Sequence, residues 1–198
     1  MFKIIEIMKR VAVDVFIKKL SMLTAGMTTE VNENFTSLSR EQLNFTPYEG
    51  AWSIAECFEH LNAYYRYYIP VFKGKISNTL YNEPTETFTS SPMGRAVYLS
   101  VKLGKVQNIK RKLKARKENN PIFNSSLKSE HPIKDYLEFQ EQFTELLKES
   151  ERIDLRRTKC PLSLRPVVKL NLGDALAFIA FHNERHIYQA KKVLKKLN

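Results

Sequence analysis

The chain has few cysteines, glycines and prolines, and it lacks any long run of apolar residues. Its 198 residues include only two cysteines, Cys57 and Cys160, so the sequence does not suggest a disulfide framework and favours a reducing, cytoplasmic environment. No window of about 18 residues is both apolar and uncharged, which excludes a transmembrane helix. Charged residues interrupt the apolar residues of segment 1–23 at helical intervals, so this segment predicts an amphipathic helix and not a signal peptide.

The rest of the composition is that of a globular protein with a sizeable core. Hydrophobic residues make up 43% of the chain, which contains 12 phenylalanines and 9 tyrosines. A disordered chain would contain far fewer aromatic residues. A chain of this length buries enough surface for one domain and is too short to indicate two. We therefore expect residues 1–198 to form a single domain.

The net charge of +11 is concentrated in one segment of the chain. Residues 91–128 contain ten lysines and arginines against one acid, Glu118, and eight of the basic residues lie in 102–117. A basic helix here could bind nucleic-acid phosphates or an anionic membrane surface. No aromatic residue is interleaved in the run to stack on bases, and no base-reading motif is present. We therefore favour a solvated polar face, on a helix that packs through Leu99, Leu103, Val106 and Leu113.

Apolar residues recur at the spacing of α-helices, and no pair of alternating strands is evident. Polar segments separate the periodic ones and are expected to be loops, the longest being 76–92 and 154–171. These patterns predict an all-α fold, an antiparallel four-helix bundle with a basic helix inserted between the second and third bundle helices, within segment 76–132. The expected helices are 3–38 with a bend near Ala25 and Gly26, 54 to just beyond Pro70, 93–117, 133–152, and Asn171 or Gly173 to Leu197.

The start of the second helix is marked by Ser53 and Glu56. This spacing predicts a capping box, in which the serine hydroxyl accepts from the Glu56 amide and the glutamate side chain reaches back to the Ser53 amide. A role as cap is therefore favoured for Glu56 over a role as catalytic base.

Polar residues interrupt the apolar face of the last helix. His182, His186 and Gln189 occupy the stripe between Ile179 and Val193, where each is expected to face the core. Buried imidazoles need hydrogen-bond or metal partners, since leaving them without any costs a few kcal/mol in total. Two histidines four residues apart on a helix lie on one side and can bind the same ion.

A third histidine lies on the edge of the apolar stripe of the second helix, at His60. Three helix-borne histidines with a water form the open arrangement of catalytic zinc sites. The alternative is a set of hydrogen-bonded core histidines, and an isolated HxxxH pattern also occurs by chance. His131 precedes a proline in a polar loop and is not a candidate.

Several neighbours of these histidines have open roles. Gln189 could bind a ligand or complete a polar cluster, and Cys57 could be a fourth ligand, although a core position is favoured. Trp52 and Tyr64 could form pocket walls or pack in the core. Arg185 is expected off the core stripe, available for a salt bridge with Glu184 or a neighbouring helix.

Two separated motifs resemble the DinB-like superfamily, also called YfiT-like metal-dependent hydrolases. The first is W-S-I-x-E-x-x-x-H-L from Trp52 to Leu61, and the second is H-x-x-R-H-x-x-Q from His182 to Gln189. The resemblance implies a four-helix bundle that holds a divalent metal, commonly nickel or zinc, through three histidines. The matching positions are His60, His182 and His186, and the basic helix 93–117 resembles an insertion found in one branch.

The resemblance further implies an enzyme acting on a small molecule, by hydrolysis or by transfer of a low-molecular-weight thiol, and a bundle that associates as a homodimer. No acid–base carboxylate pair or nucleophile motif is evident, so catalytic groups beyond the metal are unassigned. The alternatives are a metal-stabilised scaffold without catalysis, or a binding module that uses helix 102–117 for an anionic partner. Nucleic acid is not an expected partner.

Overall fold

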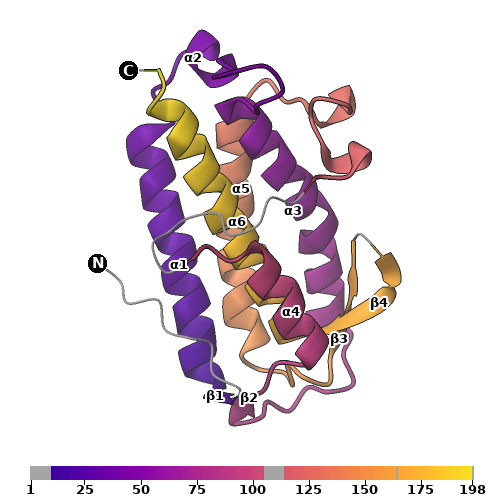
Figure 1. Cartoon of the computed structure of the whole chain (residues 1–198). Coiled ribbons are helices and arrows are strands. Elements are labelled where there is room, and N and C mark those ends of the chain that lie inside the picture. Colours follow the sequence, from indigo (N-terminus) through magenta and orange to yellow (C-terminus); the bar gives the residue numbers. More distant parts are fainter. Residues whose placement is uncertain (1–9, 105–113, 164, 198) are drawn as a thin grey trace.

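The computed structural model describes residues 10–104, 114–163 and 165–197, and helices dominate it (Figure 1). Two small antiparallel sheets accompany the helices in this part of the chain, β1 (Val11–Ala12) with β2 (Thr87–Phe88) and β3 (Lys159–Leu162) with β4 (Arg165–Asn171). Short 3-10 turns span Lys117–Asn119 and Ser125–Leu127. The α-helices are α1 (Val13–Asn34), α2 (Arg40–Asn44), α3 (Ile54–Ser77), α4 (Pro92–Val101), α5 (Pro132–Ser150) and α6 (Leu172–Leu194).

The predicted four-helix bundle is confirmed and consists of α1, α3, α5 and α6 (Figure 1). Helices α1 and α3 each pack against both α5 and α6, so α1 lies diagonally opposite α3. Helices α3 and α6 run antiparallel, since His60 meets His182 while Tyr68, two turns further along α3, meets Phe178. This crossing places residues far apart in the sequence on facing turns.

Helices α3 and α5 are parallel neighbours, whereas an antiparallel arrangement was expected from the sequence. The Asn62 amide group donates to the Pro132 carbonyl at 2.9 Å, and further along both helices the rings of Phe72 and Phe143 are 6.2 Å apart. Helix α5 therefore begins near the end of the bundle where α3 begins. Helices α1 and α6 are parallel as well, with Phe16 packed on Phe88 next to Gly173 at one end and Glu30 paired with Lys191 at the other.

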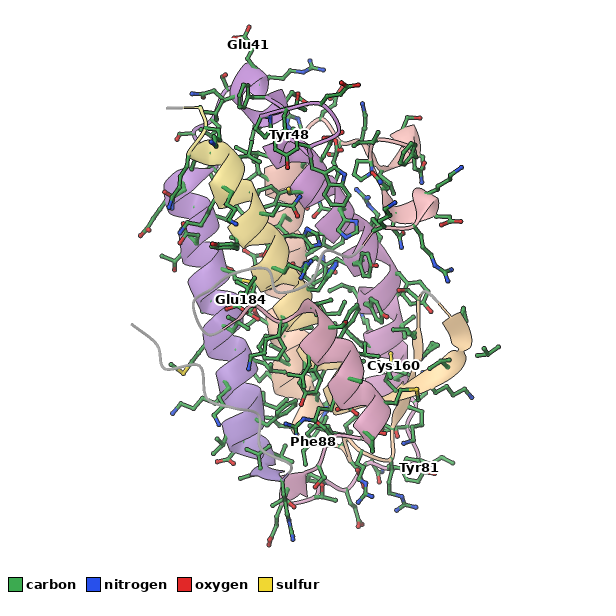
Figure 2. The ribbon with its side chains drawn as sticks, in the orientation of Figure 1. Glu41, Tyr48, Tyr81, Phe88, Cys160 and Glu184 are labelled. Atoms are coloured by element: carbon green, nitrogen blue, oxygen red, sulfur yellow. The ribbon has the colours of Figure 1, made fainter. Side chains whose placement is uncertain are left out.

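Helix α6 is the most buried helix of the bundle. Every residue from Leu172 to Asn183 is buried, because α4 packs on the side of α6 that α1 and α3 leave uncovered. Side chains fill the space between the helices, and Phe88 closes the end at which α1 and α6 begin (Figure 2). The core therefore surrounds α6, which carries two of the three candidate histidines.

The bounds predicted for the first helix, 3–38, are wrong. Residues 1–9 lie outside the described part of the chain, and the helix α1 begins at Val13 and ends at Asn34. It continues as a regular helix through Ala25 and Gly26, where a bend was expected. A separate short helix, α2, follows at Arg40–Asn44 with its own capping box at Ser39.

The inserted helix is shorter than the expected 93–117. Helix α4 ends at Val101, and Lys102 already has extended backbone angles (φ −61°, ψ 138°). Its buried residues are Gly94, Tyr98 and Val101, whereas Leu99, expected in the core, is 45% exposed. Residues 105–113, with four of the eight basic residues of 102–117 and with Val106 and Leu113, lie outside the described residues.

The segment 154–171, expected to be a loop, contains the β3–β4 hairpin. The expectation fails because Pro161 and Pro166 conceal the alternation of side chains, in which Cys160 and Leu170 are buried while Lys159 and Lys169 are exposed. The second predicted helix also continues past Pro70, which lies inside α3 with its side chain exposed. Among the described residues, no helix is long and apolar enough to cross a membrane.

Candidate metal centre

The three predicted histidines meet in the interior of the bundle. His60 comes from α3, and His182 and His186 come from successive turns of α6. Each offers a ring nitrogen, and these three nitrogens lie within 4.8 Å of one another. The side chains are almost fully buried, with 2%, 5% and 8% of their surface exposed. The sequence pattern thus identified residues that the fold brings together.

The local sequence fixes where each ring lies along its helix. Ser53 and Glu56 form the predicted capping box, with hydrogen bonds of 3.2 Å and 2.8 Å between side chain and backbone. Helix α3 therefore begins at Ile54, and His60 lies nearly two turns inside it. The four-residue spacing of His182 and His186 then presents both rings to the same turn of α3.

Hydrogen bonds orient two of the three rings. The His60 Nδ1–H donates to the backbone carbonyl of Asn119 at 2.5 Å, and the His186 Nδ1–H donates to the amide oxygen of Gln189 at 3.1 Å. Because a carbonyl oxygen can only accept, each Nδ1 carries the proton and each Nε2 keeps a free lone pair. The structure thereby gives Gln189 a partner, His186.

The donor atoms fit a metal ion in spacing and in chemistry. The Nε2 atoms of His60 and His182 are 3.2 Å apart. Two nitrogens bound to one tetrahedral zinc at about 2.1 Å are separated by about 3.4 Å, so these two require little adjustment. A hydrogen bond between the two Nε2 atoms satisfies the same distance. His182 Nδ1 has no partner among the described residues in either arrangement.

Burial keeps the three imidazoles neutral. It lowers the pKa of His60 to about 4, and it lowers those of His182 and His186 well below the usual value, with the neighbouring rings and Arg185 adding to the effect. Neutral imidazole is the form that binds metals, because the protonated ring has no free lone pair.

Aromatic rings enclose the histidines. Trp52 lies 4.8 Å from His60 and stacks at 5.6 Å on His186, measured between ring centroids. Tyr64 lies 4.3 Å from His182, and Phe178 stacks on the same ring at 5.5 Å. Trp52 is partly exposed whereas Tyr64 is buried, so the tryptophan separates the centre from solvent on its side. These walls lower the local dielectric around the rings.

The sequence model of the DinB superfamily matches residues 24–190 of this chain. The chain belongs to the DinB superfamily. Among solved structures it is similar to YfiT from Bacillus subtilis, with a TM-score of 0.50 and 12% identity over 91% of this chain and 87% of YfiT. YfiT is described as a probable metal-dependent hydrolase with an unusual four-helix bundle topology, and at this identity the likeness shows a shared fold. No curated protein matches the chain.

The other residues of this DinB-superfamily chain that the sequence analysis considered are not part of the histidine group. Cys57 is in the hydrophobic core, where burial raises the pKa of its thiol, and it is outside the histidine group. Glu56 serves as the helix cap. His131 is exposed at the start of α5. Arg185 was expected away from the buried face of the last helix, but only 5% of its surface is exposed. The reason is that α1, α3 and α4 cover α6 on several sides, so residues outside the apolar stripe are buried as well.

Sequence reasoning missed one residue of the site, Asn119. It lies in the inserted segment and supplies the hydrogen-bond acceptor for His60. The contact uses the backbone carbonyl, which every residue type has. No sequence signal identifies such a contact, because only the path of the chain determines it.

Proposed function

We propose that this protein is a metal-dependent enzyme in which His60, His182 and His186 bind one divalent ion, zinc or nickel. The observation that carries the proposal is that three buried, neutral imidazoles lie together. In His60 and His186, the Nδ1 proton is bonded to a group outside the cluster, so the Nε2 lone pair is available to an ion. Membership of the DinB superfamily and the shared fold with YfiT, itself described as a probable metal-dependent hydrolase, support it. The substrate is a small molecule.

The ion and the side chains around it would contribute different parts of the chemistry. A divalent ion held by three neutral ligands supplies a Lewis acid that lowers the pKa of a water or thiol nucleophile. Asn119 and Gln189 hold the Nδ1 protons of His60 and His186, which fixes the ring orientations. Trp52, Tyr64 and Phe178 keep bulk water away from the histidines, which lowers the local dielectric and strengthens electrostatic interactions in the site.

The proposed reaction is hydrolysis or thiol transfer, the latter with a low-molecular-weight thiol as cosubstrate. Both use a nucleophile activated beside the three histidines, and catalytic residues beyond the ligands are unassigned. A homodimer, a cytoplasmic location and a single domain over residues 1–198 are further parts of the proposal that rest on the sequence.

Metal content tests the proposal directly. Protein purified without an affinity tag is expected to contain close to one equivalent of zinc or nickel by elemental analysis. His182→Ala is expected to lose this metal, whereas His131→Ala, which changes an exposed histidine outside the group, retains it. Wild-type protein without stoichiometric metal, or equal metal content in the two variants, would contradict the proposal.

A non-catalytic, metal-stabilised scaffold is the second candidate, and the near-complete burial of all three histidines favours it. Cobalt substitution separates the two candidates. In an enzyme, azide or a small thiol reaches the ion and changes the visible absorption of the cobalt protein. In a closed scaffold the spectrum stays unchanged up to high ligand concentration.

A further inference from the structure

A cavity of about 310 Å³ lies beside the histidine group and is separate from it. Its walls come from three parts of the chain, which are α3, the inserted segment and the turn between β3 and β4. The lining residues are Ala63, Tyr64 and Tyr67 of α3, Arg116, Glu118 and Asn119 of the inserted segment, and Ser163 of the turn. None of the three histidines lines it. The volume falls at the lower end of the usual range for small-molecule sites.

Asn119 and Tyr64 form the partition between the cavity and the histidines. The Asn119 carbonyl accepts from His60 Nδ1. The Asn119 side chain lies close enough to the Tyr64 hydroxyl to offset part of the rise in its pKa that burial causes. The cavity therefore adjoins the Nδ1 edge of His60, whereas the Nε2 atom points away from it toward His182. A molecule in the cavity contacts the partition and not the metal ligands.

The cavity wall offers one cation and two aromatic rings. Among the described residues, no carboxylate lies within ion-pair distance of the exposed Arg116. Its guanidinium lies close enough to the Tyr64 hydroxyl to oppose part of the rise in the pKa of that group that burial causes. Tyr64 and Tyr67 provide flat apolar surface, and the small side chain of Ala63 lines the same cavity. Glu118 supplies one negative charge to the same wall.

We propose that this cavity binds a small monocarboxylate with a flat apolar body, whose carboxylate pairs with Arg116 while its ring lies against Tyr64 and Tyr67. A guanidinium binds a carboxylate in a planar, two-pronged geometry. Glu118 restricts the ligand to a single negative charge, because a second anionic group in so small a volume meets this carboxylate.

The bound carboxylate is linked to the metal centre through Asn119. This residue lines the cavity with its own atoms and orients His60 with its carbonyl, so a ligand that fixes the position of Asn119 also fixes the His60 ring. By thermodynamic reciprocity, the metal then changes the affinity for the carboxylate by the same factor as the carboxylate changes the affinity for the metal. This link rests on the proposed metal site, whereas carboxylate binding itself does not.

Benzoate and its neutral analogue benzamide test the cavity in metal-free, full-length protein by NMR or calorimetric titration. Benzoate is expected to bind about tenfold more tightly than benzamide, and Arg116→Gln to weaken benzoate binding about tenfold. Glu118→Gln, a matched change on the same wall, is expected to bind benzoate at least as tightly as wild type. Both side chains are exposed, so neither change threatens folding.

Three results would overturn carboxylate binding: no benzoate binding at millimolar concentration, equal binding by wild type and Arg116→Gln, or equal losses in Arg116→Gln and Glu118→Gln. The link is tested by repeating the titration on zinc-loaded protein, where the benzoate Kd of wild type is expected to change about fivefold. An unchanged Kd with zinc bound overturns the link. Failure to take up zinc overturns the proposed function instead, and the metal-free result stands.

Discussion

At the scale of single residues, the site depends on groups that touch the histidines without being ligands. Gln189 is one of these, because its amide oxygen accepts from His186 Nδ1 at 3.1 Å. Such partners set the tautomer and the orientation of the ring, and their loss commonly weakens metal binding by about 10- to 100-fold. Asn119 does the same for His60 through its backbone.

We therefore expect Gln189→Ala to weaken zinc binding by at least about tenfold while leaving the fold intact, since Gln189 is only partly buried. Competition with a chromophoric zinc chelator measures the affinity. Gln142→Ala changes an exposed glutamine of α5 and is expected to bind zinc like wild type. Equal affinities of the two variants would show that the contact with Gln189 does not matter for the metal.

The histidines themselves were predictable from sequence, and their partners only in part. His182, His186 and Gln189 share one helical face, so periodicity alone placed them together on the core side. His60 required the start of α3, which the Ser53 capping box defines. Asn119 was not predictable, because a backbone carbonyl carries no residue-specific signal and the polar loop that follows residue 117 has no periodic pattern that fixes its path.

At the scale of elements, the packing of α4 on α6 is what buries the N-terminal half of α6. The two helices approach closely at Gly94, where an added Cβ would lie 2.0 Å from the Asp174 carboxylate. The Ser91 hydroxyl caps α4 by accepting from the Gly94 amide at 2.9 Å, and it donates to the same carboxylate at 2.9 Å. Glycine is thus required here for close approach.

Gly94→Ala is expected to destabilise the protein by about 1–3 kcal/mol, because α4 must move away from α6 or Asp174 must lose its bonds to Ser91. Gly26→Ala is the matched control, since nothing lies within 4 Å of an added Cβ there. In the interior of a helix, alanine is more stable than glycine. Denaturant unfolding measures both variants, and the free energy of unfolding of the control is expected to rise by up to about 1 kcal/mol. Similar losses in both variants would contradict the close-contact argument.

The same contact predicts a pH dependence of stability. Burial raises the pKa of Asp174 above its usual 3.8, and the hydrogen bonds from Ser91 together with the Lys159 charge offset only part of this effect. The folded state therefore holds the proton more tightly than the unfolded state, so this residue lowers the free energy of unfolding as the pH rises from about 4 through its folded pKa. Asp174→Asn is expected to remove this contribution, measured as a flatter dependence of unfolding free energy on pH. An unchanged slope in the variant would show that Asp174 titrates normally.

The elements that sequence analysis missed are those whose signal is local and weak. The four bundle helices have long apolar stripes, which is why their existence and order were predictable. The β3–β4 hairpin is short and contains Pro161 and Pro166, and β1 and β2 have two residues each. Pairing between such strands is determined by tertiary packing and not by their own composition. Here β3 and β4 pack against α6, with β3 also against α3, and β1 and β2 pack against α1.

At the scale of the whole molecule, the proposed ion would join two helices that are far apart in the sequence. His60 and His182 are separated by 122 residues, and the ring nitrogens that face each other belong to the antiparallel pair α3 and α6. An ion that binds only the folded arrangement stabilises it by mass action. The unfolded chain cannot hold the three imidazoles in this geometry, so the effect on stability reports on the assembled site.

Zinc at about 100 times its Kd is expected to raise the unfolding free energy by about 2.7 kcal/mol. For a chain of this size that corresponds to an increase in Tm of about 5–10 °C, measured by thermal unfolding with and without zinc. His131→Ala is expected to show the same increase, because the exposed residue lies outside the histidine group. His182→Ala is expected to show almost none. An equal increase in the His182 variant would mean that zinc stabilises the fold from another place, and the bridge between α3 and α6 would not be its cause.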